Sequence, residues 1–296
     1  MANVIIIGNG PAGISTALYT TRAGLDTKVI GKDHGALAKA TEVENYYGLI
    51  EPISGPELIT NGMEGARRLG AEIIQDEVLG ISYEDKLTII TQKAKYSADG
   101  VVIATGTSRR TPNIQGIKEL EGLGGSYCAT CDAFFYRGKD VAVLGHSTYA
   151  LHEAQELSAT SNLVTILTNG KKPDFELPQG NNNIKVNTNK IKEITGTDIV
   201  EGVVFADKSI LSISGLFIAL GVAGSTDLAR KIGAQIDGNK IVVDENMATN
   251  IPGLYAAGDC TGGLLQISKA VYEGAKAGTE ISKYLRSKQT VKAANV

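Results

Sequence analysis

A glycine-rich segment near the N-terminus constrains the fold more than any other feature of this 296-residue chain. Residues 4–13 read VIIIGNGPAG, so a run of aliphatic residues leads directly into Gly8, Gly10 and Gly13. A helical pattern follows over residues 14–18, and G-x-G-x-x-G between a strand and a helix is typical of dinucleotide binding. The first glycine makes the tight turn, the second lets the backbone approach a diphosphate, and the third lets helix and strand pack closely. The segment predicts a Rossmann-like unit that holds a diphosphate at the N-terminus of its helix.

The same arrangement of strand, glycine turn and helix returns in the middle of the chain. Residues 141–150 read VAVLGHSTYA, with Gly145 at the tight turn and Ala150 at the helix-packing position. An internal echo of this kind predicts two related α/β domains.

Composition excludes several other classes of protein. The net charge is −3, with 43% hydrophobic and 21% charged residues, which gives no reason to expect a nucleic-acid partner. The longest apolar runs are too short to span a bilayer. No signal peptide is expected because residues 4–7 already read as a strand. With only three cysteines, the chain is not a disulfide scaffold, and we expect a cytoplasmic, reducing location.

Two of the three cysteines lie in the sequence Cys128-Ala-Thr-Cys131-Asp132. A structural zinc site needs four ligands, but only Cys260 and three histidines without paired spacing remain, so no metal is expected. In a reducing compartment a C-x-x-C pair is therefore more readily explained as redox-active. An acid beside the pair suits the proton transfers of thiol–disulfide exchange, although Asp132 is equally compatible with a helix N-cap.

Two further segments indicate which dinucleotide is bound. Residues 101–106 read VVIATG, and residues 250–259 end in Gly258-Asp259. Asp259 is placed to bond a ribityl hydroxyl of FAD, or to cap a helix expected at residues 266–285. With these elements the chain resembles flavoproteins that have two dinucleotide-binding domains. The segments TEVEN (41–45), CATCD (128–132) and GLFIALG (215–221) make it most similar to the low-molecular-weight thioredoxin reductases, over residues 4–285.

The resemblance implies an α/β fold of two Rossmann-like dinucleotide-binding domains, the second inserted into the first. A discontinuous FAD-binding domain is expected over residues 1–113 and 245–296. A degenerate NAD(P)H-like domain that carries the dithiol is expected over residues 114–244. The residues expected to contact FAD are Gly8, Gly10, Pro11, Ala12, Gly13, Asn45, Thr105, Gly106, Gly258, Asp259 and Gln266.

The resemblance also implies the roles of the dithiol residues. Cys128 would attack the disulfide of thioredoxin, Cys131 would lie against the flavin and resolve the mixed disulfide, and Asp132 would move the proton. Phe134 and Phe135 match a docking loop for thioredoxin, with core packing as the alternative. A homodimer is expected from the family. Positive charge for docking an acidic ferredoxin is expected from Arg109, Arg110, Arg137 and Lys139.

The chain departs from the family where NADPH would bind. Ser147 replaces the glycine that lets a diphosphate approach, and Leu265 replaces an arginine. Residues 168–174 read TNGKKPD, without the arginines that hold the 2′-phosphate of NADPH, so bidentate pairing is lost. This pattern resembles the ferredoxin-dependent flavin thioredoxin reductases, which lack NADPH motifs.

Three functions compete at this stage. The first is a disulfide reductase that passes electrons from ferredoxin to thioredoxin. The second is an NAD(P)H-dependent thioredoxin reductase with a divergent site, in which Lys171 and Lys172 supply point charges. The third is a flavin and dithiol redox sensor without turnover, which a thioredoxin docking loop disfavours.

Overall fold

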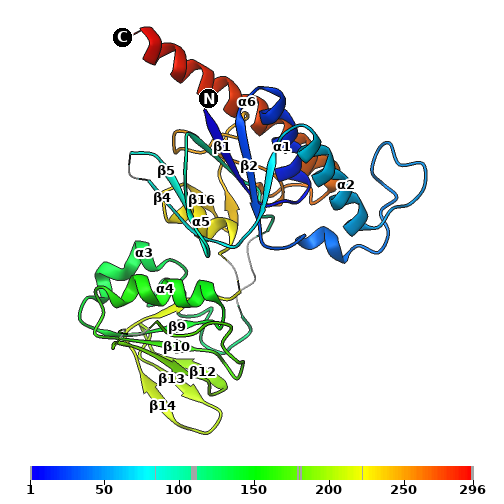
Figure 1. Cartoon of the computed structure of the whole chain (residues 1–296). Coiled ribbons are helices and arrows are strands. Elements are labelled where there is room, and N and C mark those ends of the chain that lie inside the picture. Colours follow the sequence, from blue (N-terminus) through cyan, green and yellow to red (C-terminus); the bar gives the residue numbers. More distant parts are fainter. Residues whose placement is uncertain are drawn as a thin grey trace. The chain divides into compact units, whose positions relative to one another are not determined.

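The chain folds into two compact units in the computed structural model (Figure 1). The structure describes residues 2–294 except for 84, 108–111, 179, 181 and 222, so Arg109 and Arg110 lie outside the described residues. The first unit combines residues 1–108 and 224–296, and the second comprises residues 109–223. Both contain parallel sheets with helices, which confirms the predicted α/β fold.

The first unit is built on a five-stranded parallel sheet in the order β18-β7-β1-β2-β3. Its central strand β1 is the predicted apolar run, and all four residues Val4–Ile7 are buried, as expected for a parallel strand covered on both faces. The strands are β1 (Asn3–Ile7), β2 (Asp26–Gly31), β3 (Glu72–Gln75), β7 (Gly100–Ile103) and β18 (Leu254–Ala256).

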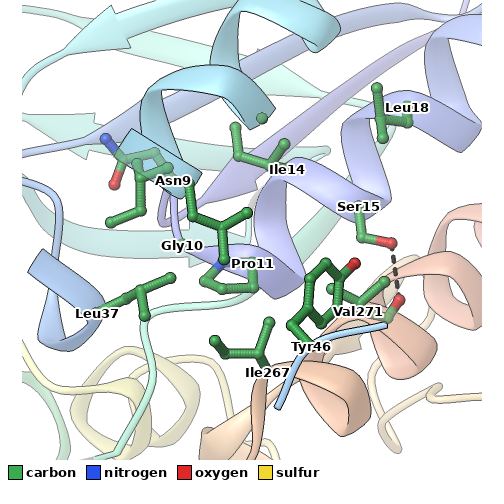
Figure 2. A pocket seen from close by; sticks show the side chains of 13 residues that line it. Asn9, Gly10, Pro11, Ile14, Ser15, Leu18, Leu37, Tyr46, Ile267 and Val271 are labelled. Carbon is green, nitrogen blue, oxygen red and sulfur yellow. Dashed lines mark hydrogen bonds between the residues drawn. The ribbon is translucent and has the colours of Figure 1, made fainter. Parts of the chain in front are cut away.

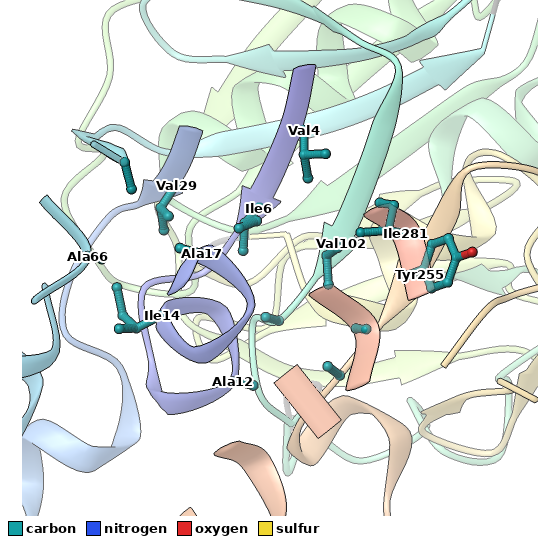
Figure 3. Close-up of a cluster of buried hydrophobic side chains, with 14 of the residues drawn as sticks. Val4, Ile6, Ala12, Ile14, Ala17, Val29, Ala66, Val102, Tyr255 and Ile281 are labelled. Carbon is teal, nitrogen blue, oxygen red and sulfur yellow. The ribbon is translucent and has the colours of Figure 1, made fainter. Parts of the chain in front are cut away.

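Three helices pack on one face of this sheet, with α1 against both α2 and α6 (Figure 1). Figure 3 shows the core between them, where Val4 and Ile6 of β1 face Ala17 of α1 and Ile281 of α6 lies near Val102. The Ser15 hydroxyl in α1 donates to the Val271 carbonyl of α6 at 2.7 Å. The helices are α1 (Pro11–Arg22), α2 (Gly55–Arg68) and α6 (Ile267–Ala294), with the short η1 (Ala36–Lys39) before α2 and η3 (Asp259–Thr261) before α6.

The second unit repeats this plan with the sheet order β11-β10-β9-β15-β8. All neighbouring strands are parallel, and β9, α4 and β10 stand where β1, α1 and β2 stand in the first unit. The elements are β8 (Gly125–Ser126), α3 (Ala129–Asp132), η2 (Ala133–Tyr136), β9 (Asp140–Leu144), α4 (Thr148–Ser158), β10 (Leu163–Leu167), β11 (Ile184–Asn187) and β15 (Leu216–Ile218).

In each unit a three-stranded antiparallel sheet is inserted in sequence between two strands of the parallel sheet, between β3 and β7 in the first unit and between β11 and β15 in the second. In the first unit this sheet is β4 (Val78–Tyr83), β5 (Leu87–Thr91) and β6 (Lys95–Ala98). In the second unit it is β12 (Ile191–Thr195), β13 (Gly202–Phe205) and β14 (Ile210–Ser212). The shared order of elements agrees with the internal echo in the sequence.

The units divide at different positions from the predicted domains. Residues 224–244 group with the first unit, whereas the predicted boundary follows residue 244. The reason lies in long-range contacts, since Lys231 donates to the Leu79 carbonyl at 3.2 Å and the Gln235 amide donates to Asn250 at 2.8 Å. This segment contains α5 (Ser225–Arg230), β16 (Ile236–Asp237) and β17 (Lys240–Ile241).

None of the helices in the described part of the chain combines the length and apolar composition needed to cross a membrane.

Candidate functional site

The first unit brings three of the predicted segments together at one edge of its sheet. Strands β18, β7 and β1 are neighbours and parallel, so the turns that follow them lie at the same edge. A side chain at Gly8 would come within 2.4 Å of the Ala104 carbonyl oxygen, and one at Gly258 within 2.8 Å of the Ala12 side chain. Residues 8–13, Thr105 with Gly106, and Gly258 with Asp259 therefore form one site.

The three glycines of the first turn meet three different requirements. Gly8 has a φ of 109°, a conformation that other residues rarely adopt. A Cβ on Gly13 would lie 1.8 Å from the Gly8 carbonyl oxygen, so α1 packs directly on the turn. A Cβ on Gly10 would have no neighbour within 4 Å. Open space at the middle glycine is the arrangement that lets a diphosphate approach the backbone, and these residues fit FAD in this respect.

A cavity of about 130 Å³ opens beside this turn (Figure 2). Its walls are mostly aliphatic, with polar groups near the turn at Asn9 and Tyr46. A cavity of this size holds only part of a dinucleotide. The lining residues that Figure 2 labels are Asn9, Gly10, Pro11, Ile14, Ser15, Leu18, Leu37, Tyr46, Ile267 and Val271.

Two side chains predicted separately as flavin contacts meet in the structure. The Asn45 amide donates to Gln266 Oε1 at 3.2 Å, although the residues are far apart in sequence. Gln266 immediately precedes α6, and its neighbour Leu265 is exposed. The pair links the TEVEN segment to the start of the C-terminal helix.

A partly buried ion pair in α6 holds the Gly258–Asp259 turn. Lys269 and Glu273 lie 2.9 Å apart with side chains only 15% and 12% exposed. Glu273 Oε2 accepts from the Gly258 amide and from the Thr261 hydroxyl, both at 2.8 Å. Lys269 donates to the Gly258 carbonyl at 2.7 Å. We did not predict this pair, although its i, i+4 spacing is visible in the sequence.

Asp259 is the polar group of this turn that stays available. Its carboxylate has no hydrogen-bond or ion-pair partner among the described residues. Partial burial raises the pKa of the Asp259 carboxyl, with Lys269 acting against the shift and Glu273 adding to it. A carboxylate in this position suits a ligand hydroxyl, as predicted for the ribityl chain.

The corresponding turn in the second unit is filled. Ser147 is 2% exposed, and its hydroxyl donates to the Gly221 carbonyl beyond β15. Tyr149 in the first turn of α4 is also buried. The open space found at Gly10 in the first unit is therefore occupied by a bonded side chain here.

The loop after β10 also lies against this turn. The Asp174 amide donates to the His146 carbonyl at 2.9 Å, and the Thr168 hydroxyl donates to the Lys171 carbonyl at 2.7 Å. Lys171 and Lys172 are exposed. The loop offers two lysines and no arginine beside the turn.

The predicted dithiol is present as a disulfide between Cys128 and Cys131. Cys128 precedes α3 and is 3% exposed, whereas Cys131 within α3 is exposed. Burial raises the pKa of the third thiol, Cys260, to about 12, and that residue is fully buried. Among the described residues, no group of His, Cys, Asp and Glu side chains is suited to hold a metal ion.

Two residues around the dithiol escaped the sequence analysis. The Ser126 hydroxyl donates to Asp132 Oδ2 at 2.6 Å and accepts from the Cys128 amide at 3.1 Å. Glu153 in α4 is 1% exposed and accepts from the Ala129 amide at 3.0 Å. Glu153 had a visible signal, because it is a charged residue at helical spacing among the apolar residues of one face of α4.

The aromatic residues after the dithiol divide into exposed and packed side chains. Phe134 is 76% and Phe135 67% exposed, and their rings meet edge to face at 6.2 Å. Tyr136 instead packs on Phe217 of β15 at 5.3 Å between ring centroids. Arg137 and Lys139 are exposed. Both phenylalanines are thus free of the core packing that was the alternative explanation.

Comparison with known proteins extends over nearly the whole chain. The family described as pyridine nucleotide-disulphide oxidoreductase matches residues 2–274. A thioredoxin reductase of Listeria monocytogenes is 35% identical over 303 residues, covering 96% of this chain and 93% of its own.

Solved structures agree with this match. An atypical thioredoxin reductase from Desulfovibrio vulgaris Hildenborough is 40% identical with a TM-score of 0.90, covering 97% of this chain and 99% of its own. A ferredoxin-flavin thioredoxin reductase from Clostridium acetobutylicum is 30% identical with a TM-score of 0.70, covering 96% and 98%.

Proposed function

The chain belongs to the low-molecular-weight thioredoxin reductases, and we propose that it takes its electrons from reduced ferredoxin rather than from NADPH. As a member of this family it is a flavoprotein disulfide reductase with a redox-active cysteine pair. In the proposed route, FAD receives the electrons and the Cys128–Cys131 dithiol passes them to thioredoxin.

The observation that carries the proposal is the contrast between the two glycine turns. Gly10 leaves space for a diphosphate, whereas the equivalent position in the second unit holds the buried, hydrogen-bonded Ser147. A diphosphate at that turn would have to displace the serine and break its bond to Gly221. We therefore propose that FAD binds in the first unit and that NADPH does not bind in the second.

The lost arginines reinforce this choice. A charge-assisted hydrogen bond contributes about 1.5–3 kcal/mol, and arginine binds phosphate in a bidentate way that lysine does not reproduce. The segment at residues 168–174, which contains lysines but no arginine, and Leu265 stand where the family has arginines. Several such losses together lower the affinity for NADPH by orders of magnitude.

The energetics of the proposed route are favourable. Plant-type ferredoxins have potentials of about −400 mV and thioredoxin about −270 mV, a difference that favours two-electron reduction of thioredoxin by roughly 6 kcal/mol. When bound, FAD supplies the ability to accept electrons singly and to deliver them as a pair. The relative from Clostridium acetobutylicum, described as a ferredoxin-flavin thioredoxin reductase, supports the same assignment.

We assign the chain's residues to this route as follows. The turn at residues 8–13 holds the FAD diphosphate, Asp259 the ribityl chain, and Asn45 with Gln266 the flavin. The other proposed FAD contacts are Thr105, Gly106 and Gly258, all beside the same turn. Cys128 attacks the partner disulfide, Cys131 resolves it, and Asp132 moves the proton. Because Cys128 is buried, docking has to expose it.

The partner surfaces follow from exposure and charge. The exposed Phe134 and Phe135 offer an apolar contact for thioredoxin next to the dithiol. Arg137 and Lys139 offer positive charge to an acidic ferredoxin, and such a contact weakens with salt. We also propose that the protein is a cytoplasmic homodimer, as expected from the family.

Anaerobic stopped-flow absorbance of the flavin tests the electron donor. Reduced ferredoxin is expected to bleach the flavin rapidly and to drive thioredoxin reduction, whereas NADPH and NADH at micromolar concentration are not. Arg137→Glu is expected to slow reduction by ferredoxin, with Lys118→Glu, an exposed lysine of the same unit, as the matched control. Rapid bleaching of the flavin by NADPH would contradict the ferredoxin proposal and favour a conventional NADPH-dependent thioredoxin reductase.

The alternative of a divergent NAD(P)H site has one observation in its favour. Lys171 and Lys172 are exposed beside the second turn and can pair with a phosphate as point charges. If that alternative holds, Lys171→Ala with Lys172→Ala raises the KM for NADPH, whereas under the ferredoxin proposal the double variant reduces thioredoxin as the parent does.

A further inference from the structure

The Ser126 hydroxyl hydrogen-bonds both to the Asp132 carboxylate and to the backbone of Cys128. It donates to Asp132 Oδ2 at 2.6 Å and lies 3.5 Å from the Cys128 carbonyl oxygen, a second acceptor. The Cys128 amide donates to Ser126 Oγ at 3.1 Å. Ser126 is 7% exposed, so solvent does not readily substitute for any of these partners.

A serine hydroxyl has one proton to donate and two lone pairs that accept. With two acceptors in reach, the single proton can point at only one of them at a time. When the Asp132 carboxyl group is ionised it accepts this proton, and the 2.6 Å separation allows that hydrogen bond. A protonated Asp132 becomes a donor to Ser126 Oγ, and the hydroxyl proton then turns to the Cys128 carbonyl.

We propose that Ser126 is a positioning residue that holds Asp132 beside Cys128 in both protonation states of the carboxyl group. The inference rests on the thioredoxin-disulfide reductase activity and is independent of the electron donor. Both states leave the buried polar groups paired, which matters because an unpaired buried donor or acceptor is costly. Without the hydroxyl, Asp132 loses its partner and the Cys128 amide loses its acceptor.

The chemistry of the outgoing step shows why this matters. A Cys128 thiolate attacks the partner disulfide, so a Cys128–partner S–S bond forms, the partner's own S–S bond breaks, and the expelled thiolate takes a proton. Cys131, deprotonated in turn, attacks Cys128, which re-forms the Cys128–Cys131 disulfide and expels the second partner thiolate with its proton. Two electrons and two protons pass from the dithiol to the partner. Asp132 takes each proton from a cysteine and returns it to a leaving thiolate, so it changes state within each turnover.

The test uses the full-length flavoprotein reduced with dithiothreitol, freed of reductant anaerobically and mixed with oxidised thioredoxin in a stopped-flow instrument. The limiting rate and the half-saturating thioredoxin concentration are measured for Ser126→Ala, Asp132→Asn and the double variant. Loss of a hydrogen bond to a charged group is expected to lower the limiting rate of Ser126→Ala by about tenfold or more, with the half-saturating concentration unchanged. In the Asp132→Asn background the same substitution is expected to lower the rate much less, because only the hydrogen bond from the Cys128 amide is then lost.

Ser161→Ala is the matched control, since Ser161 is also 7% exposed in the second unit and its hydroxyl makes no hydrogen bond among the described residues. It is expected to react as the parent does. A parental rate for Ser126→Ala, an equal fold-loss with and without Asp132, or an equal loss in Ser161→Ala would each overturn the proposal. Because chemical reduction replaces the donor, a failure of ferredoxin to reduce the flavin leaves this test unaffected.

Discussion

Asp259 lies in a turn whose other polar groups already have partners. The Gly258 amide and carbonyl and the Thr261 hydroxyl are all bound by the Lys269–Glu273 pair. Among the described residues the half-buried carboxylate has no hydrogen-bond or ion-pair partner, which destabilises its charged form and leaves it able to accept from a ligand hydroxyl. A carboxylate without a partner, in a turn whose other polar groups are hydrogen-bonded, indicates a ligand-binding group more clearly than the position of Asp259 in the sequence does.

The pKa of Asp259 makes this cost measurable. Burial raises the pKa of the folded carboxyl above its ordinary value of 3.8, so the folded state binds the proton more tightly than the unfolded state does. The contribution of the Asp259 carboxyl to the free energy of unfolding is fully present below pH 3.8 and is lost as the pH rises through the pKa of the folded state. In FAD-free protein, Asp259→Asn is therefore expected to raise the free energy of unfolding at neutral pH and to flatten its pH dependence, while weakening FAD binding.

Urea denaturation of the FAD-free parent and variant at a series of pH values checks the first effect, and FAD titration checks the second. Asp33→Asn, an exposed acid in the same unit, is the control for a simple change in net charge. A variant less stable than the parent at neutral pH would contradict the assigned direction of the shift.

The C-terminal helix illustrates what the sequence shows of an element and what it hides. Residues 266–285 read as a helix, and α6 runs over Ile267–Ala294. The sequence does not reveal that its first turns reach across to the Gly258–Asp259 turn, because such contacts depend on the distance between elements. In the same way the sequence shows Glu153 as a charged residue among the apolar residues of one face of α4. It does not show that Glu153 accepts a hydrogen bond from the Ala129 amide, because that contact requires α3 and α4 to pack together.

Removing one member of the α6 ion pair is expected to destabilise the first unit. Glu273→Ala would leave Lys269 as a partly buried charge without its carboxylate partner and take the acceptor from Gly258 and Thr261. Breaking a buried pair in this way costs about 3–5 kcal/mol, and the slight exposure of both side chains places the expected loss at the lower end. Urea denaturation of the FAD-bound protein measures it.

Glu280→Ala is the matched control, because it removes the same residue type from an ion pair in the same helix. Its partner Lys283 is 66% exposed, and exposed pairs contribute only about 0–1 kcal/mol. Equal losses in the two variants would show that the turn does not depend on Glu273.

At the scale of the whole molecule, the two units share one plan but differ at the turn that decides ligand binding. The sequence echo predicted the repeated plan, and the sheet orders β18-β7-β1-β2-β3 and β8-β15-β9-β10-β11 agree with it except at one edge, where β18 comes last in its unit and β8 comes first. The second boundary, which the family resemblance placed after residue 244, differs from the division into compact units because residues 224–244 contact distant partners such as Leu79. The substitution of Ser147 was visible, but its burial against Gly221 was not.

The proposed flavin site and the dithiol belong to different units of the chain. The proposed FAD contacts all lie in the first unit, whereas Cys128 and Cys131 lie in the second. Cys128→Ser or Cys131→Ser is therefore expected to abolish thioredoxin reduction while the protein still copurifies with FAD, identified after release by chromatography. Cys260→Ala is the control, since a buried thiol whose pKa is raised to about 12 is a poor nucleophile at neutral pH, and most activity is expected to remain. Loss of FAD together with the dithiol, or an essential Cys260, would contradict an electron route that leaves the flavin only through Cys128 and Cys131.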